Sequence, residues 1–251
     1  MSLQTLMYHR VCSGEEWYPS PYVVTQSSFR RQMHYLRDRG FYTPGLSAIL
    51  AGKIPERSNG STPFLLTLDD GYLDNYTKAF PVLQEIGFTA TIFLVADFSQ
   101  RYNWWDVPYG TPRAELLGRG HIEEMARKGI EFGSHTMNHP RLPRLSDGDL
   151  VHELAQSRHV IEDIVQKPVV SLAYPYGASD VRVKSVVKNA GYVCAFGANT
   201  GPLSLWSDPF DIRRLNVENA TGPIGMKAKM SGAEKSILWA WWKGKTALQR
   251  F

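Results

Sequence analysis

Residues 64–72 read Phe-Leu-Leu-Thr-Leu-Asp-Asp-Gly-Tyr, an apolar run that ends in two adjacent acids and a glycine. A short apolar run between Pro63 and Gly71 predicts a buried strand. This strand would deliver Asp69 and Asp70 together at its C-terminal end. Two carboxylates there repel each other and lose water, so a bound cation is the simplest compensation. A turn with two solvated acids is the alternative, because Asp-Gly is a common turn pair.

The composition is that of a folded globular protein. The 251-residue chain is 43% hydrophobic and 21% charged, which suits one large domain or a barrel. A net charge of +4 without a long basic run gives no reason to expect a nucleic-acid partner. Two cysteines form no disulfide framework. We see neither a secretory signal nor an apolar run of membrane length, so we expect a cytoplasmic protein.

Predicted strands and helices alternate along most of the chain. We expect seven strands, near residues 6, 66, 92, 132, 171, 194 and 214. We expect helices from Thr25 or Ser27 to Gly40, over 73–86 with a kink or break at Pro81, and over 121–128, 146–165 and 179–190. This alternation predicts a mostly parallel sheet with helices outside, and we favour a closed or nearly closed barrel over residues 1–218. In such barrels chemistry collects at the C-terminal ends of the strands.

Two more polar motifs follow predicted strands: SHTMNHP at residues 134–140 and AYPYG at residues 173–177. His135 and His139 stand four residues apart, so in a helical turn both imidazoles would face one metal. Two surface histidines in a loop are the alternative. With Asp70 as a third ligand, coordination positions stay open, as a catalytic metal site requires. The metal would lower the pKa of its bound water, and the second aspartate could accept the proton.

In that order, TLDDGY, SHTMNHP and AYPYG resemble the first three motifs of the polysaccharide deacetylases, carbohydrate esterase family 4. The resemblance covers about residues 1–217. It implies a distorted (β/α)7 barrel and hydrolysis of linear amide C–N bonds that removes N-acetyl groups from amino sugars. It implies a divalent metal, first of all Zn, with Co or Ni as alternatives. The matching residues imply Asp69 as the base, the ligand set Asp70, His135 and His139, and the backbone N–H of Tyr176 as an oxyanion donor.

Two positions depart from the usual family pattern. Ala173 stands where many members carry an arginine that tethers the base, and no histidine follows His159 to supply the usual general acid. A subgroup that resembles the poly-N-acetylglucosamine deacetylases takes its acid from a Tyr-His pair on the first strand, which Tyr8-His9 matches. We therefore expect His9 to be the general acid, with a buried structural histidine as the alternative. Arg213 or Arg214 could replace the missing arginine in space.

The expected substrate-binding residues are Tyr174, Trp104, Trp105 and Arg214. Indole faces stack on sugar rings, so the Trp104-Trp105-Asp106 segment would line a cleft, and ordinary loop packing is the alternative. The expected partner is an N-acetylated glycan or a lipid-linked saccharide. The sequence leaves open the sugar and a formyl or O-acetyl leaving group. A carbohydrate-binding pseudoenzyme of this fold and an iron oxygenase are the other function classes, and the closely spaced histidines disfavour the oxygenase.

Residues 219–251 follow the predicted barrel. Glycine and proline predict a linker over residues 219–232, and an amphipathic helix is expected beyond residue 233. Ile237, Leu238, Trp241 and Trp242 would share one side of that helix, with lysines beside them. We favour packing of this helix on the barrel. Peripheral contact with a membrane is the alternative, because indoles with basic neighbours suit the headgroup region.

Overall fold

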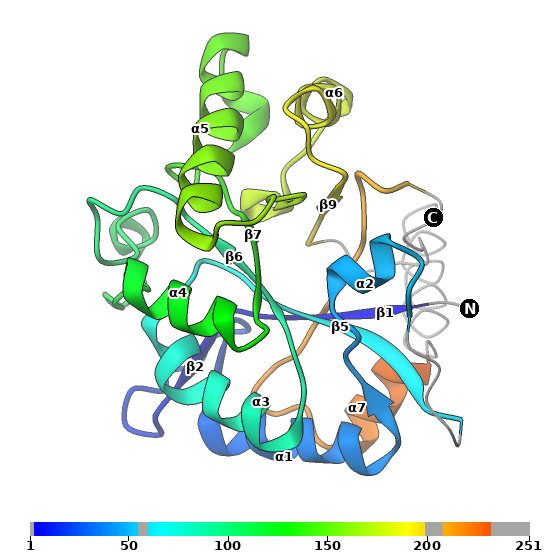
Figure 1. Ribbon diagram of the computed structural model, residues 1–251. Coiled ribbons are helices and arrows are strands. Elements are labelled where there is room, and N and C mark those ends of the chain that lie inside the picture. The colour runs from blue at the N-terminus through cyan, green and yellow to red at the C-terminus, as the bar shows by residue number, and fades with distance from the viewer. Residues whose placement is uncertain (1–2, 55–59, 199–207, 232–251) are drawn as a thin grey trace, which may run out of the picture.

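A curved sheet of seven parallel strands forms the centre of the molecule, seen in a computed structural model that describes residues 3–54, 60–198 and 208–231 (Figure 1). The strands are β1 (Gln4–Tyr8), β5 (Thr62–Leu68), β6 (Thr91–Leu94), β7 (Glu131–Ser134), β8 (Ser171–Ala173), β9 (Cys194–Phe196) and β10 (Leu215–Asn216). Their order in the sheet is β10-β1-β5-β6-β7-β8-β9. A parallel bridge from Phe196 to Ile212 connects β9 to the segment before β10. The sheet thus curls into the distorted barrel that the sequence predicts.

Strand β5 is buried on both faces, which explains its continuous apolar sequence. Phe64, Leu66 and Leu68 belong to the large core beneath the helices, whereas Leu65 packs with Phe93 in a smaller cluster inside the barrel. Successive side chains of a strand point to opposite faces. By this alternation Asp69 lies on the inner face, in line with Leu65.

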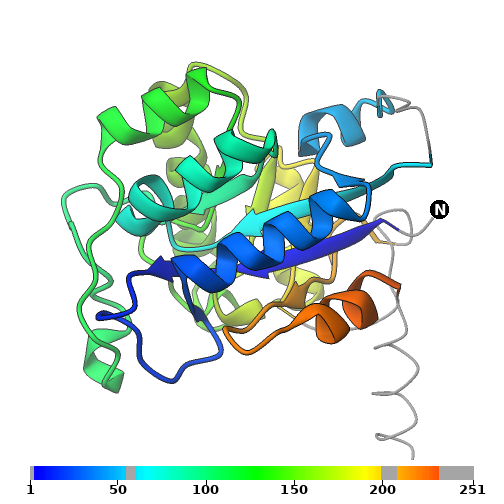
Figure 2. The same ribbon diagram turned by 90° about the horizontal axis from the view of Figure 1, so that it is seen from below.

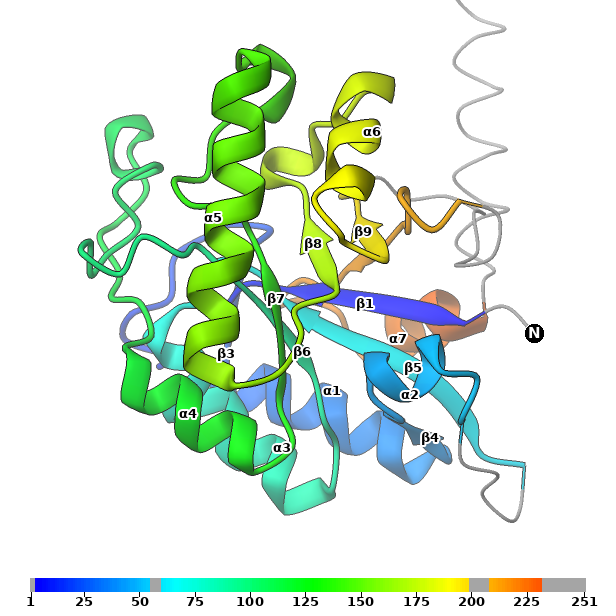
Figure 3. The ribbon, with the colours of Figure 1, turned by 45° about the horizontal axis from the view of Figure 1, so that its top comes forward.

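Helices cover the outside of the sheet (Figure 3). The main ones are α1 (Gln26–Asp38), α3 (Phe80–Ile86), α4 (Arg119–Arg127), α5 (Asp147–Val165) and α6 (Val181–Asn189), with a short helix α2 (Leu46–Leu50). Side chains that accept a backbone N–H start three of them: Thr25 for α1, Ser146 for α5 and Asp180 for α6. The predicted helix over 73–86 is a π-helical stretch, Asn75–Ala79, that runs into α3. Pro81 is the second residue of α3, directly after the π-helical stretch, and the chain stays helical through it.

Short elements add to the predicted pattern near the N-terminus. Strands β2 (Arg10–Cys12) and β3 (Val23–Thr25) pair in parallel on either side of residues 13–22. Strand β4 (Phe41–Tyr42) pairs with the start of β5. Two- and three-residue strands carry too little periodicity to be recognised in a sequence.

The predicted linker over 219–232 contains a helix, α7 (Pro223–Ser231), which lies against α1 (Figure 2). Pro223 suits a first helical position, and Met226 and Met230, four residues apart, are buried. Tertiary packing therefore overrides the glycine and proline content that predicted a linker. The amphipathic segment from residue 233 onward lies outside the described residues. Within the described part of the chain, no helix combines the length and apolar character needed to cross a membrane.

Candidate metal centre

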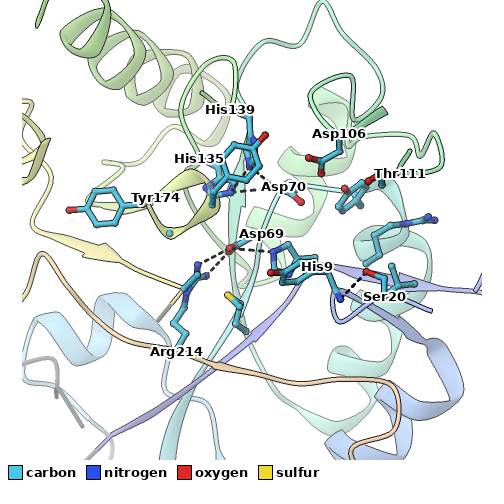
Figure 4. Close-up of a pocket in the computed structure, with 18 of the residues that line it drawn as sticks. His9, Ser20, Asp69, Asp70, Asp106, Thr111, His135, His139, Tyr174 and Arg214 are labelled. Carbon is cyan, nitrogen blue, oxygen red and sulfur yellow. Dashed lines mark hydrogen bonds and ion pairs between the residues drawn. The ribbon is translucent and has the colours of Figure 1, made fainter. Parts of the chain in front are cut away.

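The three sequence motifs meet where β5, β7 and β8 end, around a cavity of about 330 Å³ (Figure 4). Residues from all three motifs line this cavity, together with His9 from the end of β1. Gly71 makes the turn after β5 possible: its φ is +71°, and a Cβ there would lie 2.7 Å from Leu94 Cδ2. The predicted convergence of the motifs at one end of the barrel is therefore found.

Asp70, His135 and His139 form one buried cluster. Asp70 Oδ1 lies 3.3 Å from His135 Nε2 and 3.4 Å from His139 Nε2, and the two Nε2 atoms are 3.2 Å apart. A tetrahedral ion about 2.0–2.1 Å from its ligands separates the ligand atoms by about 3.3–3.4 Å. Asp70 Oδ1 is also buried without a well-formed hydrogen bond to any described residue. These donor atoms therefore fit a divalent cation such as Zn²⁺.

The protonation of the cluster suits metal binding. Burial acts to raise the pKa of Asp70, but the two imidazoles outweigh it and hold that pKa well below its usual value. Burial lowers the pKa of His139 to about 4, so this imidazole is neutral at pH 7. His135 Nδ1 lies 2.8 Å from the carbonyl oxygen of Ala173, which can only accept a hydrogen bond. Burial acts to lower the pKa of His135, but Asp70 and Asp69 outweigh it and raise that pKa; in the neutral ring, Nε2 is the nitrogen with the free lone pair.

The turn between the histidines is not the helical turn that their spacing would allow. Thr136 has φ +71° and His139 has φ +57°, so the chain doubles back within the motif. The described part of the chain has five non-glycine residues with positive φ, and four lie at this site: Asp70, Thr136, His139 and Tyr176. Such conformations persist only where the surroundings impose them, and they are frequent at functional sites.

Asp69 forms a two-point ion pair with Arg214, which follows Arg213 just before β10. Nη1 of Arg214 donates to Oδ1 at 2.6 Å, and Nη2 donates to Oδ2 at 2.7 Å. Nε of the same side chain donates to the carbonyl of Gly197 at 2.9 Å. Burial acts to raise the pKa of Asp69, but Arg214 contributes most to a net lowering. Of the two arginines that could replace the one missing at Ala173, Arg214 is the one that contacts Asp69; it also lines the cavity, and its expected part in substrate binding stays a prediction.

His9 lies on the other side of Asp69 from Arg214 (Figure 4). Its Nε2 is 3.9 Å from Asp69 Oδ2, and its ring packs on Tyr22 with the centroids 4.6 Å apart. His9 Nδ1 is buried and has no hydrogen-bond partner among the described residues. Burial lowers the pKa of His9 although Asp69 and Asp70 oppose the shift. His9 therefore belongs to the cavity, as the sequence predicts, and not to the apolar core.

The two predicted tryptophans do not line the cavity. Trp105 is buried and stacks on His139, with ring centroids 4.8 Å apart and planes at 26°. Trp104 packs edge-on against Trp105. Loop packing, the alternative interpretation, therefore describes both indoles. The neighbouring Asp106 does line the cavity, and burial followed by the charge of Asp70 raises its pKa to about 6.

The two tyrosines of the AYPYG motif also line the cavity. Tyr174 is buried, and its hydroxyl donates to the carbonyl of Phe210 at 3.0 Å. Tyr176 is 40% exposed, contacts His139 edge-on and has the Arg141 guanidinium 4.3 Å above its ring. Tyr176 therefore forms part of the cavity mouth.

A parallel α/β barrel with a two-histidine, one-carboxylate cluster beside a second ionised aspartate has the architecture of a metal-dependent hydrolase. The sequence profile of the polysaccharide deacetylases matches residues 56–195, which is more than half of the chain. The chain belongs to the polysaccharide deacetylase family, and the family predicted from the three motifs is thus confirmed.

Three comparisons describe its relatives. YxkH of Bacillus subtilis is named as a polysaccharide deacetylase. It is 26% identical to this chain over 217 residues, which cover 86% of this chain and 71% of YxkH. The poly-β-1,6-N-acetyl-D-glucosamine N-deacetylase of Staphylococcus aureus is 24% identical, covering 79% of this chain and 69% of its own. The deacetylase PplD of Streptococcus pyogenes, solved with acetate, shares the fold with a TM-score of 0.77 at 21% identity, covering 92% of this chain and 98% of PplD.

Proposed function

We propose that this protein is a metal-dependent N-deacetylase that hydrolyses the acetamide of an N-acetylated amino sugar in a glycan. One observation carries the proposal: Asp69 is held ionised by Arg214 next to the buried cluster of Asp70, His135 and His139. A protein that only binds sugars needs no buried base beside a metal site. The printed activity of the Staphylococcus aureus relative, an N-deacetylase of poly-β-1,6-N-acetyl-D-glucosamine, supports the same class of substrate.

Asp70, His135 and His139 would hold the metal, which is most reasonably Zn²⁺ with these ligands. When bound, a divalent metal polarises a carbonyl and lowers the pKa of a bound water. Asp69 would act as the general base and take a proton from the attacking water, because Arg214 keeps its carboxylate charged and fixes its orientation. The backbone N–H of Tyr176, at the cavity mouth, would donate to the oxyanion.

The leaving group of amide hydrolysis is an amine, which needs a proton as the C–N bond breaks. His9 would supply it. The 3.9 Å gap between His9 Nε2 and Asp69 Oδ2 supports a short path along which the proton taken by the base reaches the acid. Burial disfavours the charged form of His9 and lowers its pKa. A protonated His9 therefore gives its proton to the departing amine more readily.

The test is acetate release from an oligomer of β-1,6-linked N-acetylglucosamine, measured with Zn²⁺-loaded protein and checked by mass spectrometry for the free amine. Asp69→Asn should retain the metal but lose about 10²–10⁴-fold in turnover, since an amide cannot take the proton. Asp163→Asn, on the exposed side of α5, is the matched control and should behave as wild type. Wild-type turnover in Asp69→Asn would remove Asp69 from the mechanism. A metal-loaded protein that releases no acetate from any N-acetylated glycan would leave the pseudoenzyme as the better description.

A further inference from the structure

The loop that leads from His135 to His139 has little secondary structure of its own. Between His135 and His139 the chain forms bends, and left-handed backbone at Thr136 and His139 reverses its direction. Residues with a Cβ avoid this conformation, and a β-branched threonine avoids it strongly. An outside contact must therefore stabilise the loop in the shape that brings the two imidazoles together.

Glu153 on α5 provides such a contact. Its Oε2 accepts the backbone N–H groups of Met137 and Asn138, both at 2.9 Å, and its Oε1 accepts Asn138 Nδ2 at 2.7 Å. The side chain is buried, and no Lys, Arg or His within the described ranges forms an ion pair with it. A buried carboxylate without a cation needs hydrogen-bond donors, and this loop supplies three. The three donors of the loop therefore satisfy the carboxylate of Glu153, and the carboxylate holds the loop in place.

A second contact from the same helix fixes the start of the loop. Ser157 lies one turn after Glu153 on the same face of α5, and its Oγ is 2.7 Å from Ser134 Oγ. Ser134 Oγ in turn accepts the backbone N–H of Thr136 at 3.0 Å. Helix α5 thus holds both the entry of the loop and its tip, which directly precedes His139.

We propose that Glu153 is a positioning residue of the metal centre, which fixes the backbone N–H groups of Met137 and Asn138 just before His139 and thereby raises the affinity of the site for its metal. This inference rests on the metal site of the proposed function. The reason is preorganisation: with Glu153 in place, the three donor atoms already lie 3.2–3.4 Å apart, so the ordering of the loop is completed on folding and not on metal binding. Outer-shell partners of metal ligands are typically worth about 10–100-fold in metal affinity or activity.

The test compares Glu153→Ala and Glu153→Gln with Asp163→Asn, which removes the same charge from an exposed position of the same helix. The Zn²⁺ dissociation constant is measured by competition with a chromophoric chelator, and the visible absorption bands of the Co²⁺-loaded proteins report the ligand geometry. We expect Glu153→Ala to weaken Zn²⁺ binding about 10–100-fold and to change the Co²⁺ bands. Glu153→Gln keeps an oxygen acceptor for both backbone N–H groups, so its affinity should lie between those of Glu153→Ala and wild type. Asp163→Asn should match wild type in both measurements.

Wild-type affinity and unchanged Co²⁺ bands in Glu153→Ala would overturn the inference. If circular dichroism shows that Glu153→Ala does not fold, Glu153→Gln and Asn138→Ala decide, because the second variant removes only the bond to Oε1. Wild-type affinity in both would overturn it equally, whereas weaker binding in both with a folded spectrum supports it. A wild-type protein that binds no Zn²⁺ overturns the proposed function as well, and this outcome differs from a loss of the Glu153 effect alone.

Discussion

Replacing Arg214 by methionine removes both hydrogen bonds that hold Asp69 while keeping an apolar stem among the neighbouring rings of Phe93 and Phe196. Each lost bond joins two charged groups and is worth about 1.5–3 kcal/mol. Two such bonds give about 3–6 kcal/mol, which overlaps the ~3–5 kcal/mol typical of breaking a buried ion pair by removing one partner. We expect the metal-free variant to lose about 3–5 kcal/mol of unfolding free energy at pH 7.

The pH dependence follows from the same pair. Arg214 lowers the pKa of Asp69 below its unfolded value, so its stabilisation is present above the unfolded pKa and is lost as pH falls through the folded pKa. Without Arg214, burial is opposed only by the weaker effects of His135 and His9, so the pKa of Asp69 rises and the base becomes protonated at higher pH. The acid limb of the pH–rate profile should therefore move to higher pH in Arg214→Met.

Urea unfolding at several pH values and the pH profile of acetate release measure these two effects. Arg213→Met is the matched control, since the neighbouring arginine forms no ion pair among the described residues and its loss should leave the acid limb in place. Arg214→Lys should recover part of the stability, because an ammonium group cannot form the two-point contact. A profile in Arg214→Met that coincides with wild type would refute the assignment of Arg214 as the tether of the base.

The proposed metal ligand His139, the proposed acid His9 and the cavity carboxylate Asp106 give further tests. His139→Ala should lose the metal and activity together, and full metal occupancy by elemental analysis would contradict its assignment as a ligand. His9→Ala should slow hydrolysis of an amide more than that of an activated ester, whose leaving group needs no proton; equal losses would indicate a structural role. Burial raises the pKa of Asp106 to about 6, so the folded state binds more protons than the unfolded state between about pH 4 and pH 6, and stability falls as pH rises through this range. Asp106→Asn should flatten that fall in urea unfolding of the metal-free protein, and an unchanged slope would contradict the raised pKa.

The sequence was sufficient for the barrel and for the convergence of its motifs. Buried parallel strands are continuous apolar runs, and their polar C-terminal ends meet at one edge, so the sequence alone groups Asp70, His135 and His139. Local spacing was less informative about how they meet. The four-residue interval between the histidines suggested a helical turn, whereas the structure has two left-handed residues held by α5.

Contacts between distant segments were the part that the sequence could not supply. Arg213 and Arg214 are adjacent and chemically equal, and only the approach of the segment before β10 to the end of β5 directs the second one to Asp69. The contact between Glu153 and the loop could not be predicted, because a single glutamate on an amphipathic helix is normally solvated. For Trp105 the sequence left sugar stacking and loop packing both open, because exposed stacking and buried packing have the same sequence pattern.

Strand β10 pairs with β1, so the last strand of the barrel closes on the first, with Leu215 opposite Leu6. This closure brings Arg214 to Asp69, whereas all three proposed metal ligands lie earlier in the chain. During synthesis, His139, the last of these ligands, is therefore added about 75 residues before Arg214, the arginine that keeps Asp69 ionised. Pairing of β10 with β1 also joins the strands that are farthest apart in the sequence, so it carries the largest loop-closure cost of the strand pairs. Pairing of β10 with β1 is therefore the step that would complete the proposed catalyst.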